Sequence, residues 1–365
     1  MKGTLKLGRI RGIKIEVHWT FTLLLIWVVF LDIQRGGSFN SALLNIIFIL
    51  LIFVCVVLHE LGHALTARRY KINTKGITLL PIGGVASLEK MPEKPGQELL
   101  VALAGPAVNV LIALLLLLVV PLRTYLGLDA ESLEQLLSAP SLETLLFYLL
   151  VANIMLVAFN LIPAFPMDGG RVFRAILSFT MDRVRATEIA ASLGQVLAVI
   201  FFILGLFYNP FLVLIALFIF IGAYGENKMV KQSSLVEGHL ISEAMLTNIT
   251  LIHPDNHLAE VVDIVIAGSE KDFVVMSGDQ IEGLLYHKDI LKNARNDTLK
   301  VSDIMNVQFK TLNASMPLQR FFDLLSNQKN LFFPVTDETG KLLGAIDMNN
   351  VSEFLVLKAR SIPAN

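Results

Sequence analysis

Long apolar runs, separated by short charged loops, fill the chain between residues 19 and 225. They lie at about 19–33, 43–66, 98–120, 143–164, 187–207 and 210–225. Several approach the roughly 20 residues that a helix needs to cross a hydrocarbon core of about 30 Å. A bilayer offers the backbone no hydrogen-bond partners, so such runs must fold as helices. The pattern predicts a multi-pass α-helical membrane protein with about six spans.

The composition agrees with this class and excludes others. Hydrophobic residues make up 54% of the chain and charged residues 17%, against roughly 25% charged in soluble proteins. The formal net charge of −1 argues against nucleic acid as a partner. Cys55 is the only cysteine, which excludes an intramolecular disulfide. The first residues lack the features of a cleaved signal peptide.

Basic residues predict the orientation. Those on one side of the six predicted spans are Lys2, Lys6, Arg9, Arg11, Lys14, Arg68, Arg69, Lys71, Lys75, Arg171, Arg174, Arg183, Arg185, Lys228 and Lys231. The alternate loops hold only Arg35 and Arg123. Because Lys and Arg accumulate in cytoplasmic loops, we expect a cell-membrane protein whose N- and C-termini are both cytoplasmic.

Two shorter segments have the pattern of β-strands. Apolar and charged residues alternate between Gly12 and Val17, which is typical of a strand. The apolar segment Gly76–Lys90 is too short to span and contains Pro81, Gly83 and Gly84. It predicts a membrane-associated β-hairpin, which a membrane tolerates where the backbone is paired or lines a wet cavity.

The residues after 237 read as a soluble domain built from an internal repeat. The segment "ISEAMLTNITLIHPDNHLAEVVDIV" is echoed about sixty residues later by "VSDIMNVQFKTLNASMPLQRFFDLL". Likewise "IEGLLYHKDIL" is echoed by "LLGAIDMNNVS". Two copies of one small α/β unit therefore pack as a pair. We expect a membrane domain over 1–230 and a soluble domain over 237–360.

A metal-binding pattern ends the second apolar run. In "HELGH", His59 and His63 are four residues apart, so on a helix they share one face and can bind one metal. Glu60 lies beside them, where it can take a proton from water. The alternative is a pair of buried, hydrogen-bonded histidines, but ionisable groups near membrane depth persist mainly where they have a function.

A catalytic zinc needs a third protein ligand, and Asp168 is the best candidate. It follows Pro163 and Pro166, which break the preceding helix, and precedes two glycines that free the backbone. A solvated helix-capping aspartate is the alternative interpretation. Of its competitors, Asp182 is flanked by arginines in a solvated loop, and Glu226 is an interfacial residue at the end of the sixth span.

These motifs resemble those of the site-2 protease family of intramembrane metalloproteases. The resemblance rests on "HELGH", on "NLIPAFPMDGGR" (Asn160–Arg171) and on "LAGPAVN" (Leu103–Asn109), and it covers nearly the whole chain. The repeated tail resembles a pair of CBS modules. The family resemblance implies one zinc ion per chain, with site residues as follows: His59, His63 and Asp168 as ligands, Glu60 as general base, and Asn160 and Asn153 to position the scissile carbonyl.

The resemblance implies an intramembrane zinc endopeptidase that cleaves single-span, membrane-anchored regulatory proteins near the cytoplasmic face. Glu60 would take the proton of the attacking water and return it to the leaving amine. The substrate must be unwound, and the hairpin at 76–90 could bind it as an added strand. Two alternatives are a transporter or channel gated by the CBS pair and an inactive membrane scaffold. The few charges in the second to fourth spans disfavour the first, and the intact Glu60 disfavours the second.

The CBS-like repeat leaves two functions open. Nucleotide-binding members hold the ribose with an Asp at the end of a short motif, and Asp289 in "GLLYHKD" and Asn350 in "GAIDMNN" occupy that place. Tyr286 and Asp347 stand where Thr is usual, and the carboxylate of Asp347 would repel phosphate. The pair is therefore either an adenine-nucleotide sensor or a module for homodimerisation and substrate docking.

Overall fold

The computed structural model of the chain describes residues 3–81, 83–88, 91–122, 141–296, 298–325 and 331–360. The chain divides into two compact units, residues 1–230 and 231–365, and each is described by itself. Arg123, which was counted for the predicted orientation, lies outside the described residues.

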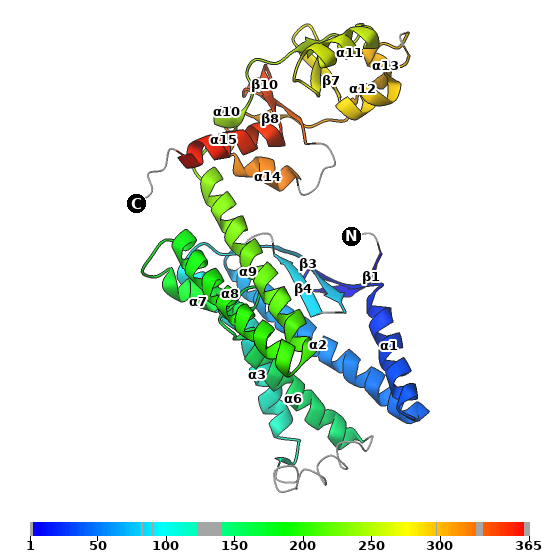
Figure 1. Cartoon of the computed structure of the whole chain (residues 1–365), viewed down its shortest axis with the longest axis vertical. Helices are drawn as coiled ribbons and strands as arrows, with labels where there is room; N and C mark the ends of the chain where they lie inside the picture. The colour runs from blue at the N-terminus through cyan, green and yellow to red at the C-terminus, as the bar shows by residue number, and fades with distance from the viewer. Residues whose placement is uncertain are drawn as a thin grey trace. The chain divides into compact units, whose positions relative to one another are not determined.

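The first unit combines a small sheet with long helices (Figure 1). Its elements are β1 (Thr4–Ile10), β2 (Ile13–His18), α1 (Phe21–Gln34), α2 (Phe39–Arg69), β3 (Thr74–Leu80), β4 (Gly83–Leu88), α3 (Pro95–Leu117), α6 (Leu142–Asn160), α7 (Asp168–Leu177), α8 (Arg183–Phe207) and α9 (Pro210–Val236).

Within the described residues, five helices are long and apolar enough to cross a membrane, namely α2, α3, α6, α8 and α9. The first predicted span forms the shorter apolar helix α1. Large apolar side chains remain exposed along these helices, for example Ile26 at 64%, Leu111 at 57% and Phe202 at 45%. Exposed apolar surface on this scale is costly in water and favourable against lipid tails. The fold is that of an α-helical membrane protein, as the sequence predicts.

The sheet confirms both predicted β-segments. Its strand order is β1-β2-β3-β4, with β2 and β3 parallel and the other two pairs antiparallel. The predicted strand near residues 12–17 is β2, and the apolar hairpin is formed by β3 and β4. Both β3 and β4 pack against α2, and β4 is an edge strand of the sheet. An edge strand presents unpaired N–H and C=O groups to a further strand.

Small residues bring α2 and α3 close together near the C-terminal end of α2. Helix α2 packs against α3 and α6, and α3 also packs against α7. Ala67 on α2 is fully buried against Val101 of α3, and a Cβ at Gly62 of α2 would lie only 2.6 Å from the carbonyl oxygen of Ala104 on α3. Small side chains at such contacts allow helix backbones to approach, which is the usual basis of helix packing in membranes. This packing places the end of α2 beside the start of α7.

The second unit contains two copies of one motif. Its elements are α10 (Ile241–Ala244), β5 (Leu251–Ile252), α11 (Leu258–Ala267), β6 (Phe273–Ser277), β7 (Gln280–Leu285), α12 (His287–Asn293), α13 (Val301–Ile304), β8 (Leu312–Asn313), α14 (Gln319–Leu325), β9 (Phe333–Thr336), β10 (Leu342–Ile346) and α15 (Met348–Arg360). The sheets β5-β6-β7 and β8-β9-β10 each join one parallel pair to one antiparallel pair. The predicted repeat is thus a structural repeat.

Candidate active site

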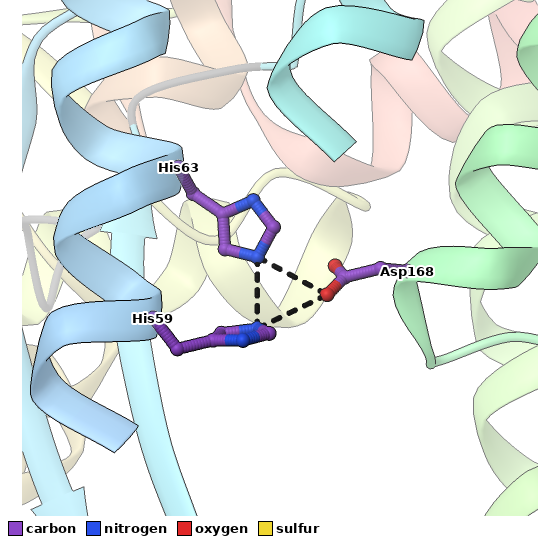
Figure 2. A group of neighbouring side chains, drawn as sticks. All are labelled: His59, His63 and Asp168. Carbon is purple, nitrogen blue, oxygen red and sulfur yellow. Dashed lines mark hydrogen bonds and ion pairs between the residues drawn. The ribbon is translucent and has the colours of Figure 1, made fainter. Parts of the chain in front are cut away.

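Helix α2 presents His59 and His63 on one face, toward α3 and α7. Figure 2 shows both imidazoles pointing from this helix at the carboxylate of Asp168. The side chains of His59 and Asp168 are each 8% exposed, and that of His63 is 5% exposed. The predicted pair therefore shares a helix face, and the predicted third residue joins it from an element more than a hundred positions later.

Asp168 reaches this position because the chain breaks between α6 and α7. Helix α6 ends at Asn160, and α7 begins at Asp168 itself, so the carboxylate stands in the first turn. The two glycines after Asp168 do not free the backbone as expected, because they are helical. A Cβ at Gly169 would collide with the carbonyl groups of Leu161 and Ile162. Glycine is needed at this position because α7 packs closely on the segment that joins it to α6.

The three side chains form a nearly equilateral triangle of donor atoms. His59 Nε2 and His63 Nε2 lie 3.1 Å apart, and Asp168 Oδ2 lies 3.2 Å from the first and 3.1 Å from the second. The other carboxylate oxygen, Oδ1, lies 3.9 Å from Arg171 Nη1. Within the described part of the chain, this is the group of His and carboxylate ligands that could hold a metal ion.

Hydrogen bonds behind the histidines fix which nitrogen faces the triangle. His59 Nδ1–H donates to Asn109 Oδ1 at 2.5 Å, and His63 Nδ1–H donates to the carbonyl oxygen of Val101 at 2.7 Å. When Nδ1 carries the proton of a neutral imidazole, Nε2 has a free lone pair that can bind a metal. Such outer hydrogen bonds orient metal-binding histidines in proteins generally.

The triangle fits a zinc ion in its chemistry and its size. With both histidines in these tautomers, two nitrogen lone pairs and a carboxylate converge, and a bound metal cation would relieve their mutual repulsion. Tetrahedral ligands about 2.0 Å from zinc stand roughly 3.3 Å apart, close to the edges observed. Gly105 on α3 leaves room there, since a Cβ would collide with both Nε2 atoms.

Strand β4 passes directly beside Glu60. A Cβ at Gly84 would lie 2.8 Å from Val56 Cγ1, which is too close, and 3.1 Å from Glu60 Cγ, which is a tight contact. The absence of a side chain at Gly84 therefore lets the backbone of the edge strand approach the predicted general base.

The structure separates the two asparagines expected to position the scissile carbonyl. Asn153 is fully buried; its Nδ2 donates to the carbonyl of Leu149, and its Oδ1 accepts from Asn109 Nδ2 at 2.8 Å. It thus supports the His59 hydrogen bond rather than facing a substrate. Asn160 is only partly buried, and its Nδ2 donates to the carbonyl of Leu156 at 2.9 Å. Its Oδ1 therefore remains available at the end of α6.

Sequence reasoning did not identify Asn109 and Gly105 as site residues. Both belong to the motif "LAGPAVN", which was recognised only as a family pattern. Their spacing is informative, because residues four apart on a helix share a face. A small residue and an amide on one face of an apolar helix, opposite the two histidines, would have indicated space for an ion and a hydrogen bond behind it.

The competing acidic residues lie elsewhere. Asp182 caps α8, accepting a hydrogen bond from the backbone N–H of Arg185, and its side chain is 59% exposed, in line with a solvated loop. Glu226 differs from the expectation. It does not end a helix, because α9 continues to Val236, and its carboxylate pairs with the buried Arg174.

In the second unit, the residues expected to hold a ribose have local roles. Asn350 accepts from the backbone N–H of Asp347 and donates its own backbone N–H to that carboxylate, at the start of α15. Asp289 lies in the first turn of α12 and is partly exposed. Burial raises the pKa of the nearby Asp272 carboxyl above its ordinary value, and the carboxylate of Asp347 raises it further. These carboxyl groups disfavour a phosphate.

Two family models and several relatives match the chain. The model of peptidase family M50 matches residues 47–204, and the CBS domain model matches residues 301–357. A zinc metalloprotease of Methanocaldococcus jannaschii is 33% identical over 363 residues, which cover 99% of this chain and 97% of that protein.

Two further matches are shorter. Stage IV sporulation protein FB of Bacillus subtilis is 27% identical over 131 residues, covering 36% of this chain and 40% of that protein. The solved site-2 protease from Methanocaldococcus jannaschii is 42% identical, covers 61% of this chain and 95% of that chain, and has a TM-score of 0.44.

A helical membrane unit with a buried His–His–Asp cluster, joined to a CBS unit, defines a membrane zinc metalloprotease. The chain belongs to peptidase family M50, the site-2 protease family. It is a zinc metallopeptidase, and its C-terminal unit contains a CBS domain.

Proposed function

We propose that the chain is an intramembrane endopeptidase with one zinc ion, cleaving membrane-anchored regulatory proteins near the cytoplasmic face. The observation that carries this proposal is the convergence of His59, His63 and Asp168 on one point, with Glu60 adjacent. Three protein ligands and one open position are the pattern of a catalytic zinc site rather than a structural one. Family membership supports the peptidase activity.

Each residue has a definite role in this proposal. Zinc, when bound by His59, His63 and Asp168, supplies a Lewis acid that polarises the scissile carbonyl and makes water more acidic. Glu60 takes a proton from the attacking water and then gives it to the leaving amine nitrogen. Asn160 donates or accepts a hydrogen bond that positions the substrate backbone beside the site.

The substrate would bind as an extended strand. A transmembrane helix shields its own carbonyl groups, so the cleaved segment must unwind before attack. Strand β4 offers an unpaired edge, and Gly84 brings that edge to Glu60. Addition of the substrate to β4 satisfies the exposed backbone groups of both strands.

The decisive experiment measures zinc per protein after purification without added metal. We expect Asp168→Ala to lose most zinc and all detectable cleavage of a model single-span substrate, because a carboxylate ligand is gone. Asp182→Ala is the matched control, since its exposed side chain caps a different helix. Full zinc occupancy in Asp168→Ala, or loss of zinc in Asp182→Ala, would contradict the proposed ligand set.

For the second unit we propose a regulatory role as a tandem CBS module over residues 237–360. The carboxyl groups of Asp272 and Asp347 favour a role in dimerisation or substrate docking over binding of an adenine nucleotide. If a nucleotide does bind, Asp289→Ala should weaken it more than Asn350→Ala, because the Asn350 amide is engaged in the α15 cap. Calorimetry with AMP and ATP on the full chain tests both points.

A further inference from the structure

A second buried cluster of charged residues joins α7 to α3, α8 and α9. Arg174, on α7, is fully buried and donates through Nε and Nη2 to Glu98 of α3. Its Nη1 donates to Glu226 of α9 at 2.6 Å. Arg183 of α8 lies 3.6 Å from the second oxygen of Glu98 and completes a neutral set of two cations and two anions.

This cluster is not accounted for by the chemistry proposed above. Glu98 is 1% exposed and Glu226 17% exposed, so both carboxylates have given up most of their hydration. Replacing such a buried set with apolar side chains of similar volume is often neutral or stabilising. Stability alone therefore does not explain why the chain keeps these charges. The Arg174 guanidinium also lies 4.9 Å from the ring centre of Phe165, in the break before α7.

The short helix α7 connects this cluster to the metal site. Asp168 is its first residue and Arg174 is six residues later, about 9 Å along the axis at 1.5 Å per residue. A helix of ten residues held at both ends has little freedom to slide or rotate. At its start α7 is held by the close packing of Gly169, and near its end by the three donor groups of Arg174.

We infer that Arg174 is a positioning residue that sets the place of Asp168 by holding α7 between Glu98 on α3 and Glu226 on α9. The planar guanidinium suits this role, because its fork of donors reaches two carboxylates in different directions at once. The three donors of a lysine ammonium lie on one nitrogen, so they cannot reproduce the spread of the guanidinium contacts. The inference rests on the zinc site proposed above and extends it to residues that touch neither metal nor substrate.

The test measures the zinc dissociation constant by competition with a metal chelator, beside thermal unfolding. We expect Arg174→Lys to weaken zinc binding about 10-fold to 100-fold, the range known for residues that orient ligands. Cleavage should recover when zinc is raised, because the ligands themselves remain. Arg185→Gln is the control, since its pair with Asp182 is exposed, and it should keep wild-type zinc affinity.

A neutral double variant separates positioning from the cost of an unpaired buried charge. Arg174→Met and Glu226→Gln together remove one cation and one anion, and Glu98 keeps Arg183 as its partner. We expect this protein to unfold near the wild-type temperature but to bind zinc as weakly as Arg174→Lys. Wild-type zinc affinity in the double variant would overturn the inference.

The same measurements distinguish this inference from the proposed zinc site. Loss of zinc in Asp168→Ala together with normal affinity in both Arg174 variants would overturn only the positioning role. A wild-type protein that binds no zinc, or an Asp168→Ala variant that keeps full affinity, would overturn the zinc site and the positioning role together. Weakened binding in both sets of variants supports both.

Discussion

Glu60 lies one residue from a zinc ligand and is not itself part of the ligand triangle. Glutamine has nearly the same shape but cannot accept and return a proton. We predict that Glu60→Gln keeps wild-type zinc content and lowers kcat by about 10²-fold to 10⁴-fold, the usual contribution of a general base. Single-turnover cleavage of a purified single-span substrate measures this. Near-normal turnover in that variant would exclude Glu60 as the base.

The space beside the two histidines depends on one position of α3. We predict that Gly105→Ala lowers zinc affinity at least 10-fold, because the added methyl group collides with Nε2 of both His59 and His63. Gly96→Ala is the control on the same helix, since its Cβ would meet only Phe179 Cζ, at 3.9 Å. Chelator competition measures both proteins. Equal affinity in the two variants would show that the site does not require this space.

The sequence predicted best those site residues whose positions follow from local spacing along the chain. The i, i+4 spacing placed His59 and His63 on one face, and the prolines around Asp168 indicated a break that the structure has. Asn153 was assigned a role at the substrate from the family resemblance alone, since it lies outside the matching motifs. Its side chain instead supports Asn109, a contact between α3 and α6 that no local pattern encodes.

Strand β4 is the element on which substrate recognition depends in this proposal. We predict that Val85→Pro reduces cleavage at least 10-fold with normal zinc content, because proline removes a backbone donor and disfavours strand pairing. Leu5→Pro in β1, the other edge strand of the same sheet, should leave cleavage unchanged. Cleavage rate per bound zinc is the measurement. Equal losses in the two variants would point to general disruption of the sheet.

Element boundaries were harder to predict than the elements themselves. The sixth apolar run was expected to end at residue 225, where charged residues begin, yet α9 continues to Val236. Hydropathy reports where lipid-facing residues stop, whereas a helix ends where its hydrogen bonds and caps end. This difference explains why Glu226 was interpreted as an interfacial residue. Its partner Arg174 is 52 positions away in the sequence, beyond the range of any local pattern.

At the scale of the whole molecule, the predicted orientation follows from the unequal distribution of Lys and Arg. We predict that both termini are cytoplasmic, because basic residues flank the same side of the predicted spans. Reporter domains fused after Asn365 and before the first span should be active only in the cytoplasm. Activity of either reporter outside the cell would reverse the orientation and the expected side of cleavage.

The architecture of the two units was largely predictable because each has its own periodic signal. Membrane-length apolar runs indicate spans through length alone, and the repeat after residue 237 predicted two similar units, which the paired three-stranded sheets confirm. The sequence contained no comparable signal for the four-helix charge cluster. Its members are spread from α3 to α9, and only the packed structure shows that their charges cancel.

That cluster also sets an order in which the protein can be completed during synthesis. Glu98 leaves the ribosome 76 residues before Arg174, and Arg174 leaves it 52 residues before Glu226. A nascent chain that ends before α9 therefore carries a guanidinium with one of its two carboxylate partners missing. With α7 held only in part, Asp168 would not yet be fixed beside the histidines. On the positioning role inferred for Arg174, a nascent chain that lacks α9 would therefore bind zinc more weakly than the complete chain.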